Sequence, residues 1–141
     1  MMRETPDVFR SLGSAVREVR ARVDRSLQRS GLRLGQFQVL RLLWEEDELT
    51  PREIAGRLGV EMPTVTRTVQ RMMRDGLVER RKHPGDARSV FICLSPRAKE
   101  LRAALTELIG EETEHALRGF SPVERAALVD MLDRIADNSK D

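Results

Sequence analysis

Residues 49–94 constrain the fold of this 141-residue chain more than any other stretch. Thr50 and Glu53 have the spacing of a capping box, in which each side chain accepts a hydrogen bond from the other residue's backbone N–H. An apolar stripe predicts a short helix after this cap, and Gly59 suits the turn that ends it. Pro63 suits the first turn of a second helix. The stretch therefore begins with two short helices joined by a tight turn.

A β-hairpin is predicted after these helices. Residues 77–80 and 90–94 have the composition of short strands, and the segment between them, 81–88, is basic and rich in turn-forming residues. The order of two helices and a hairpin describes a winged helix-turn-helix, which places one helix in a DNA groove and the hairpin beside it. We therefore predict a mainly α fold with a small β-wing.

The second helix of this motif carries two different faces. Val65, Val69, Met72 and Met73 recur at helical spacing and are expected to point inward. The remaining arc carries hydroxyls, an amide and guanidiniums, which are the groups that read base edges or bind phosphates. These candidate DNA-binding residues are Thr64, Thr66, Arg67, Gln70, Arg71 and Arg74.

The tip of the hairpin supplies two further candidates. Arg88 is expected near a narrow minor groove, where an inserted guanidinium is favoured. Asp86 precedes it by two residues, so we predict that its carboxylate orients the arginine through a charge-assisted hydrogen bond. A generic surface turn is the alternative, and the preceding helices argue against it.

The charge distribution agrees with a polyanionic partner for the centre of the chain. The whole chain has a net charge of only +2, but residues 62–99 hold nine cations and three anions, which leaves +6. Residues 100–141 hold five cations and ten anions, which leaves −5. A basic centre beside an acidic tail points to nucleic acid at the centre only.

Amphipathic helices are expected on both sides of the motif. Thr5, Pro6 and Asp7 predict a helix cap with the proline in the first turn, followed by an apolar stripe that runs to Leu27, and Ser121 opens a final helix. These stripes exceed what one small winged domain can bury, which predicts a homodimer. The expected domains are a dimerisation helix (1–33), the winged helix-turn-helix (34–95) and C-terminal dimerisation helices (96–141). A twofold dimer predicts a pseudo-palindromic site with half-sites roughly 10 bp apart.

The first helix also has an arginine-rich face. Such a face can contact a membrane surface or DNA, although a solvated face is the more common case, and we favour the latter. Its members are Arg3, Arg10, Arg17, Arg20, Arg22, Arg25 and Arg29. In the second helix, Phe37, Leu40, Leu43 and Trp44 form a stripe that we interpret as core and not as a ligand pocket.

The sequence resembles the MarR family of bacterial transcription regulators, most strongly over residues 34–95. The motifs that carry the resemblance are TVTR at 64–67, GLV at 76–78, the D-x-R of Asp86 and Arg88, Gln36-Phe37 before Val39-Leu40, Glu53-Ile54-Ala55, and Leu94-Ser95 after the wing. Two departures follow the wing, where Ser95 replaces the usual threonine and Arg97-Ala98 replace a common glycine. The second departure is an expected place for a change in how the following long helix starts.

The resemblance implies an obligate homodimer with interleaved terminal helices, a recognition helix in the major groove and a wing in the minor groove of double-stranded DNA. Thr64, Thr66, Arg67, Gln70 and Arg71 would face the groove. Family members typically repress, and many release DNA when a small phenolic or other effector binds or when a cysteine oxidises. The effector site would lie where the first, second and fifth helices meet the DNA-reading lobe.

Other functions have weaker support in the sequence. No phosphate-binding glycine loop and no nucleophile–base spacing predicts an enzyme, and no cofactor is expected. Glu111 and His115 have metal-compatible spacing, but a solvated helix face is more common. Cys93, the single cysteine, is a candidate redox switch, although a packed cysteine is the favoured interpretation. With no signal peptide or membrane span visible, a cytoplasmic location is expected.

Three hypotheses follow from the sequence. The first is a repressor that an effector releases from DNA. The second is an activator or architectural DNA binder of the same fold without an effector. The third is a winged-helix module that binds protein in place of DNA.

Overall fold

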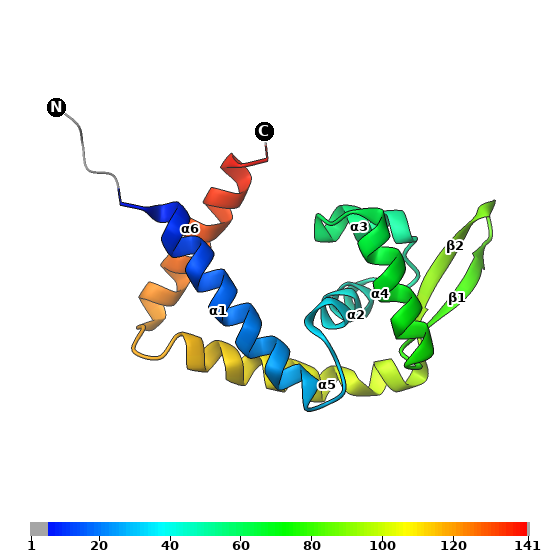
Figure 1. Cartoon of the computed structure of the whole chain (residues 1–141), viewed down its shortest axis with the longest axis horizontal. Helices are drawn as coiled ribbons and strands as arrows, with labels where there is room; N and C mark the ends of the chain where they lie inside the picture. The colour runs from blue at the N-terminus through cyan, green and yellow to red at the C-terminus, as the bar shows by residue number, and fades with distance from the viewer. Residues whose placement is uncertain (1–5, 141) are drawn as a thin grey trace.

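The computed structural model describes residues 6–140, so Arg3 and Thr5 lie outside the described residues. The chain forms six helices and one two-stranded sheet within this range, arranged as a winged lobe and an extended helical lobe (Figure 1). The elements are α1 (Val8–Gln28), α2 (Leu34–Glu45), α3 (Pro51–Leu58), α4 (Met62–Arg74), β1 (Val78–His83), β2 (Asp86–Leu94), α5 (Pro96–Ala116) and α6 (Pro122–Asn138).

Local capping determines where several of these helices begin. The predicted box at α3 is present, because Thr50 accepts from the Glu53 N–H at 3.2 Å while the Glu53 carboxylate accepts from the Thr50 N–H. Gly59 ends the same helix at a φ of 67°, in the left-handed region that favours glycine. At α1 the prediction was wrong in detail. Asp7 is the N-cap, accepting from the Arg10 N–H, so Pro6 precedes the helix and does not form its first turn.

The winged lobe has a closed apolar core. The stripe of α2 that we interpreted as core is buried there, with Leu40 fully buried and Phe37 edge-on to Trp44 at 6.0 Å between ring centroids. The α4 residues Val65 and Met72 pack into the same core. The Trp44 indole N–H donates to the Ala98 carbonyl at 3.0 Å, which joins α2 to the start of α5. The departure at Arg97-Ala98 therefore leaves the start of α5 intact.

The sheet is longer than the sequence indicated. Strand β1 runs antiparallel to β2 from the pair Val78–Leu94 to the pair His83–Asp86, so the basic segment that we assigned to the turn mostly belongs to the strands. The turn itself is Pro84 and Gly85. Near this end of the hairpin the His83 ring lies against the Phe91 ring of the facing strand, with centroids 4.4 Å apart.

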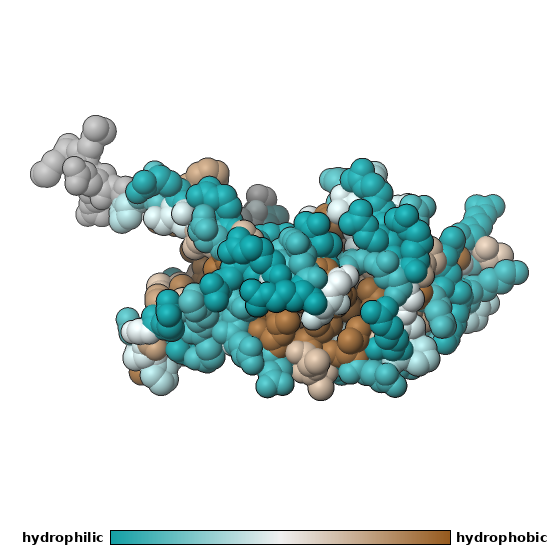
Figure 2. Space-filling model, turned by 60° about the horizontal axis from the view of Figure 1, so that its bottom comes forward, coloured by the Kyte–Doolittle hydropathy of each residue, from teal (hydrophilic) through white to brown (hydrophobic). Residues whose placement is uncertain are grey.

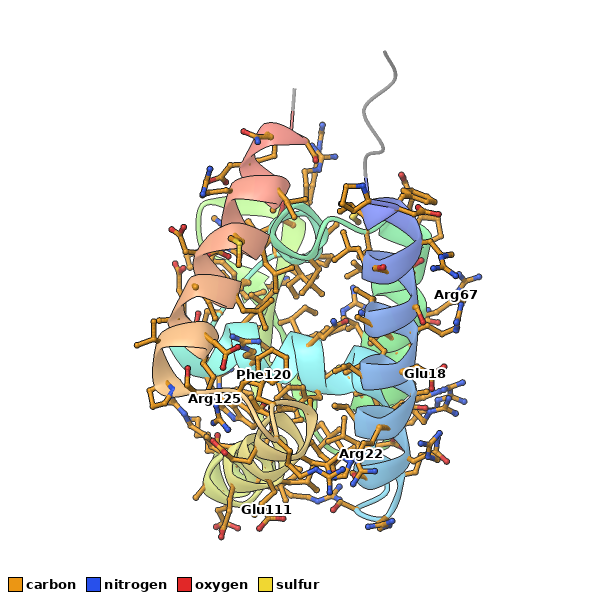
Figure 3. The ribbon with its side chains drawn as sticks, turned by 90° about the vertical axis from the view of Figure 1, so that its left-hand side faces the viewer. Glu18, Arg22, Arg67, Glu111, Phe120 and Arg125 are labelled. Carbon is orange, nitrogen blue, oxygen red and sulfur yellow. The ribbon has the colours of Figure 1, made fainter. Side chains whose placement is uncertain are left out.

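The helical lobe has little core of its own. Helix α1 is joined to α5 by Glu112, which accepts hydrogen bonds from Ser26 at 2.7 Å and from Arg22. The Ser26 hydroxyl, followed by the Arg22 guanidinium, lowers the pKa of the Glu112 carboxyl and keeps it charged. Helix α6 has no buried residue, and Figure 3 shows α1 and α6 standing apart.

Apolar surface therefore remains uncovered on this lobe. In addition, Figure 2 shows an apolar patch in the middle of the underside of the molecule. The exposed large apolar side chains of α1 and α6 are Val8, Phe9, Val16, Val19, Val123, Val129, Met131, Leu132 and Ile135. None of the helices in residues 6–140 is both long and apolar enough to cross a bilayer.

Candidate nucleic-acid interface

Helix α4 presents all of its predicted DNA-binding side chains to solvent. Val65, Val69 and Met72 are buried as expected, which fixes the rotation of the helix about its axis. The six residues from Thr64 to Arg74 that we singled out are all exposed. They divide between two sides of the helix, however, and do not form one continuous row.

One side of α4 faces the helical lobe across a groove of about 550 Å³. Thr64, Arg67 and Arg71 line this groove together with Thr68, which the sequence pattern had not singled out. The opposite wall comes from α1 and from the start of α2. The candidate residues on this side are therefore within reach of a ligand that also contacts the helical lobe.

The other side of α4 faces the wing across a smaller cavity of about 170 Å³. Thr66 and Gln70 line it from α4, and Arg80 lines it from β1. Its remaining walls are mainly apolar, formed by Pro51, Met62, Val69, Met73, Val90 and Ile92. An apolar cavity with one guanidinium at its edge suits a small aromatic acid.

A buried glutamine fixes the C-terminal end of α4. Gln36, only 2% exposed, donates to the Asp75 carboxylate at 2.9 Å and accepts from the Arg33 N–H at 3.0 Å. Asp75 is the C-cap of α4, and its carbonyl accepts from Arg97 of α5. Ser95 donates to the carbonyl of the next residue, Gly76, at 2.7 Å. The end of the helix is thus held from both α2 and α5.

The same network reaches back to α1. The Asp24 carboxylate accepts two hydrogen bonds from the Arg33 guanidinium, at 3.0 and 3.1 Å, and one from the Leu34 N–H at 2.9 Å. The bonds from Arg33, followed by the one from Leu34, lower the pKa of Asp24. Hydrogen bonds therefore connect α1, the start of α2 and the end of α4 in sequence.

The wing holds Arg88 at an exposed position near the turn, as predicted. The predicted role of Asp86 was wrong in one respect, because its carboxylate accepts from the Arg88 backbone N–H at 2.9 Å and from the Ser89 hydroxyl at 3.1 Å, not from the guanidinium. These two bonds lower the pKa of Asp86, the backbone bond most. Asp86 shapes the strand start and leaves the arginine side chain free of that carboxylate.

Cys93 faces away from solvent. The residue is 0% exposed, and burial raises the pKa of its thiol. Both effects oppose formation of the reactive thiolate. Within residues 6–140 no group of three or more histidine, cysteine, aspartate or glutamate side chains is placed to hold a metal ion.

The arrangement of a helix-turn-helix followed by a basic wing matches known regulators. The sequence model of the MarR family matches residues 32–90. The chain is 33% identical over 102 residues to the regulator TtmR of Methylorubrum extorquens, and 31% identical over 104 residues to the repressor YetL of Bacillus subtilis. The chain belongs to the MarR family. Each match covers 72% of this chain but only 51% of TtmR and 62% of YetL, so the chain spans about half the length of TtmR.

Solved MarR structures share the fold over nearly the whole chain. A MarR regulator from Methanosarcina mazei Go1 superimposes with a TM-score of 0.87 at 21% identity, covering 95% of this chain and 96% of that one. A mutant of Escherichia coli MarR in complex with operator DNA gives 0.86 at 22% identity, with 92% and 94% covered. BpsR of Bordetella bronchiseptica, whose DNA binding is regulated by 6-hydroxynicotinic acid, gives 0.86 at 23%, with 97% and 98% covered.

Proposed function

We propose that this MarR-family protein is a homodimeric repressor of transcription that binds double-stranded DNA in a sequence-specific manner. The observation that carries the proposal is the exposed face of α4 beside a basic wing, within a segment of net charge +6. Thr64, Thr66, Arg67, Gln70, Arg71 and Arg74 are the proposed contacts in the major groove and Arg88 the proposed contact in the minor groove, with Asp86 shaping the wing.

The homodimer is supported by the uncovered apolar surface of the terminal helices. Side chains such as Val19 of α1 and Leu132 of α6 are 46% and 40% exposed in the single chain, and both belong to regular amphipathic stripes. A second copy would cover them and place two copies of α4 on one face of a duplex. In this proposal residues 1–33 and 96–141 dimerise, and residues 34–95 read the DNA.

Release by a small aromatic effector is supported by two observations. The fold is shared with BpsR, whose DNA binding responds to 6-hydroxynicotinic acid. In addition, the apolar cavity between α4 and the wing has an arginine for a small aromatic acid, although this cavity is not the site between the first, second and fifth helices that the family resemblance implies. A ligand there would contact Thr66 and Gln70, so it would compete with their DNA contacts. Titration of aromatic acids into the DNA complex tests this; release supports it, and an unchanged complex with every acid favours a binder without an effector.

Substitution of Arg88 by alanine tests DNA recognition by the wing. Removal of one good groove contact costs about 1–3 kcal/mol, so we expect operator affinity to fall by roughly one order of magnitude in a gel shift. Arg118→Ala removes the same charge at a position that follows α5 and lies outside the winged helix-turn-helix, and is the matched control. Equal affinity of the two variants would refute the proposed role of the wing, and a wild type that binds no DNA would favour a protein-binding module.

A further inference from the structure

The groove between α1 and α4 concentrates positive charge from both lobes. Its lining includes Arg20 from α1, Arg33 at the start of α2, and Arg67 and Arg71 from α4. Asp24 is the only acidic residue among the lining side chains. Four guanidiniums and one carboxylate leave a formal charge of +3 around a space of about 550 Å³.

The single carboxylate is already occupied. Asp24 accepts from the Arg33 guanidinium and from the Leu34 N–H at 2.9 Å. Within residues 6–140, the side chains of Arg20, Arg67 and Arg71 have no hydrogen bond or ion pair. Three cations from two facing helices therefore share one open space without a counter-ion from the protein, an arrangement that favours a bound anion.

The position of the groove indicates which anion this is. A helix that lies in a major groove about 12 Å wide has one sugar-phosphate ridge on each side. On one side of α4 lie the wing and Arg80, where the first ridge would run. On the other side lies the groove, with Arg20 in the wall opposite α4, where the second ridge would run. Figure 3 shows Arg67 projecting past α1 on the side away from α6, where it is open to such a ridge.

We propose that this groove receives a phosphodiester of the DNA backbone and that Arg20 of α1 is a DNA-binding residue outside the winged helix-turn-helix. The inference rests on the proposed DNA-binding function and adds a contact from the helical lobe to it. Arg20 binds the phosphate from one wall while Arg67 and Arg71 approach from the other. Asp24 keeps Arg33 and the start of α2 in place beneath them.

The contact has a mechanical consequence. Arg20 lies on the same helix as the exposed apolar residues Val16 and Val19, which are proposed to meet the partner subunit. A phosphate held between Arg20 and α4 therefore spans the two lobes. Arg20 and the α4 arginines can bind the same phosphate only when α1 and α4 are at one spacing. Binding to DNA therefore positions α1 and the recognition helix α4 relative to each other.

The salt dependence of binding tests the contact directly. A plot of log affinity against log salt concentration has a negative slope, and removal of one phosphate contact reduces the magnitude of this slope by about 1. A dimer has two copies of Arg20, so Arg20→Gln is expected to reduce the magnitude by about 2. Affinity for operator and for unrelated DNA is expected to fall by the same factor. Arg25→Gln is the matched control, because it removes the same charge from α1 but lines a separate groove against α5. Equal slopes for the two variants would overturn the proposal.

A chemically modified duplex identifies the partner of Arg20. An operator with a neutral methylphosphonate at the phosphate flanking the half-site, on the side away from the wing, is expected to bind wild type at least as weakly as native DNA binds Arg20→Gln, because Arg67 and Arg71 lose the same partner. On this modified operator, Arg20→Gln is expected to cause little further loss of affinity, because the phosphate charge that Arg20 binds is already absent. Fully additive losses would overturn the assignment.

Failure of this inference is distinguishable from failure of the proposed function. If wild type binds operator and Arg88→Ala does not, but Arg20→Gln keeps the wild-type slope, the protein binds DNA without the α1 contact. If wild type binds no DNA sequence above background, the proposed function fails and the Arg20 contact fails with it. Circular dichroism and sedimentation of both glutamine variants are expected to match wild type, since neither side chain is buried.

Discussion

The winged lobe and the terminal helices both carry regular apolar stripes but bury them very differently. In the winged lobe Leu40, Ile54 and Met72 are fully buried, and the core is closed by α2, α4 and the sheet. In α6 no residue is buried, although an apolar stripe runs along it. An apolar stripe left open on a stable helix indicates a missing partner. The winged lobe is therefore complete within one chain, whereas we propose that a second copy of the chain completes the helical lobe.

The largest expected effect comes from the incomplete lobe. Leu132→Glu places a charge in the middle of the α6 stripe, and because burying an unpaired charge is costly we expect it to convert the dimer to monomers. Sedimentation velocity measures this. Arg134→Glu, at a position of α6 that is 73% exposed, should remain dimeric. A Leu132→Glu protein that sediments like wild type would show that α6 is not at the interface.

The complete lobe should respond differently to a core substitution. Leu40→Ala removes a fully buried side chain, so we expect the free energy of unfolding to fall by about 2–5 kcal/mol. Urea denaturation followed by circular dichroism measures the loss. The loss should be the same at low and high protein concentration when the Leu132→Glu background is used, because the winged core lies within one chain. A loss of unfolding free energy that depends on protein concentration would contradict the conclusion that the winged core lies within one chain.

The hydrogen bond that fixes the end of α4 within the winged lobe is expected to have an intermediate effect. Gln36→Glu keeps the acceptor for the Arg33 N–H but sets a carboxylate against Asp75, so we expect operator affinity to fall by about 1–3 kcal/mol. Adding Asp75→Asn restores a donor–acceptor pair, and affinity should return. Fluorescence anisotropy with operator DNA measures both. A double variant that binds as weakly as Gln36→Glu would show that this bond does not position α4.

The smallest expected effect concerns Cys93. The thiol is buried and its pKa is raised, so peroxide should leave operator affinity unchanged within error in wild type and in Cys93→Ser alike. Anisotropy before and after peroxide treatment is the measurement. A loss of affinity in treated wild type alone would support the redox hypothesis instead.

Local sequence patterns were sufficient to predict helices α3 and α4. The capping box at Thr50 and Glu53, the glycine at Gly59 and the periodicity of α4 depend on residues within one or two turns, and the structure has them where the patterns place them. The short wing strands were underestimated because the pairing beyond Lys82 depends on contacts across the hairpin, such as His83 against Phe91.

The arrangement of the site depended on contacts between distant residues. Gln36 and Asp75 are 39 positions apart, and nothing in either segment indicates that they meet. Arg20 was one of seven arginines on a face that we expected to be solvated. Only the packing of α1, fixed by Ser26 and Glu112 at 2.7 Å, shows which of these arginines faces α4. The rotation of a helix relative to a distant partner is set by such contacts and not by its own periodicity.

Selection of binding sites from a random DNA pool with the purified full chain tests the central claim most directly. The predicted result requires both that the winged lobe reads DNA and that the helical lobe pairs with a second copy. We predict enrichment of a pseudo-palindrome whose two half-sites lie roughly 10 bp apart, centre to centre. Wild type should select it, and Leu132→Glu should not. A single unpaired half-site would contradict the dimer, and a pool without enrichment would contradict sequence-specific DNA binding.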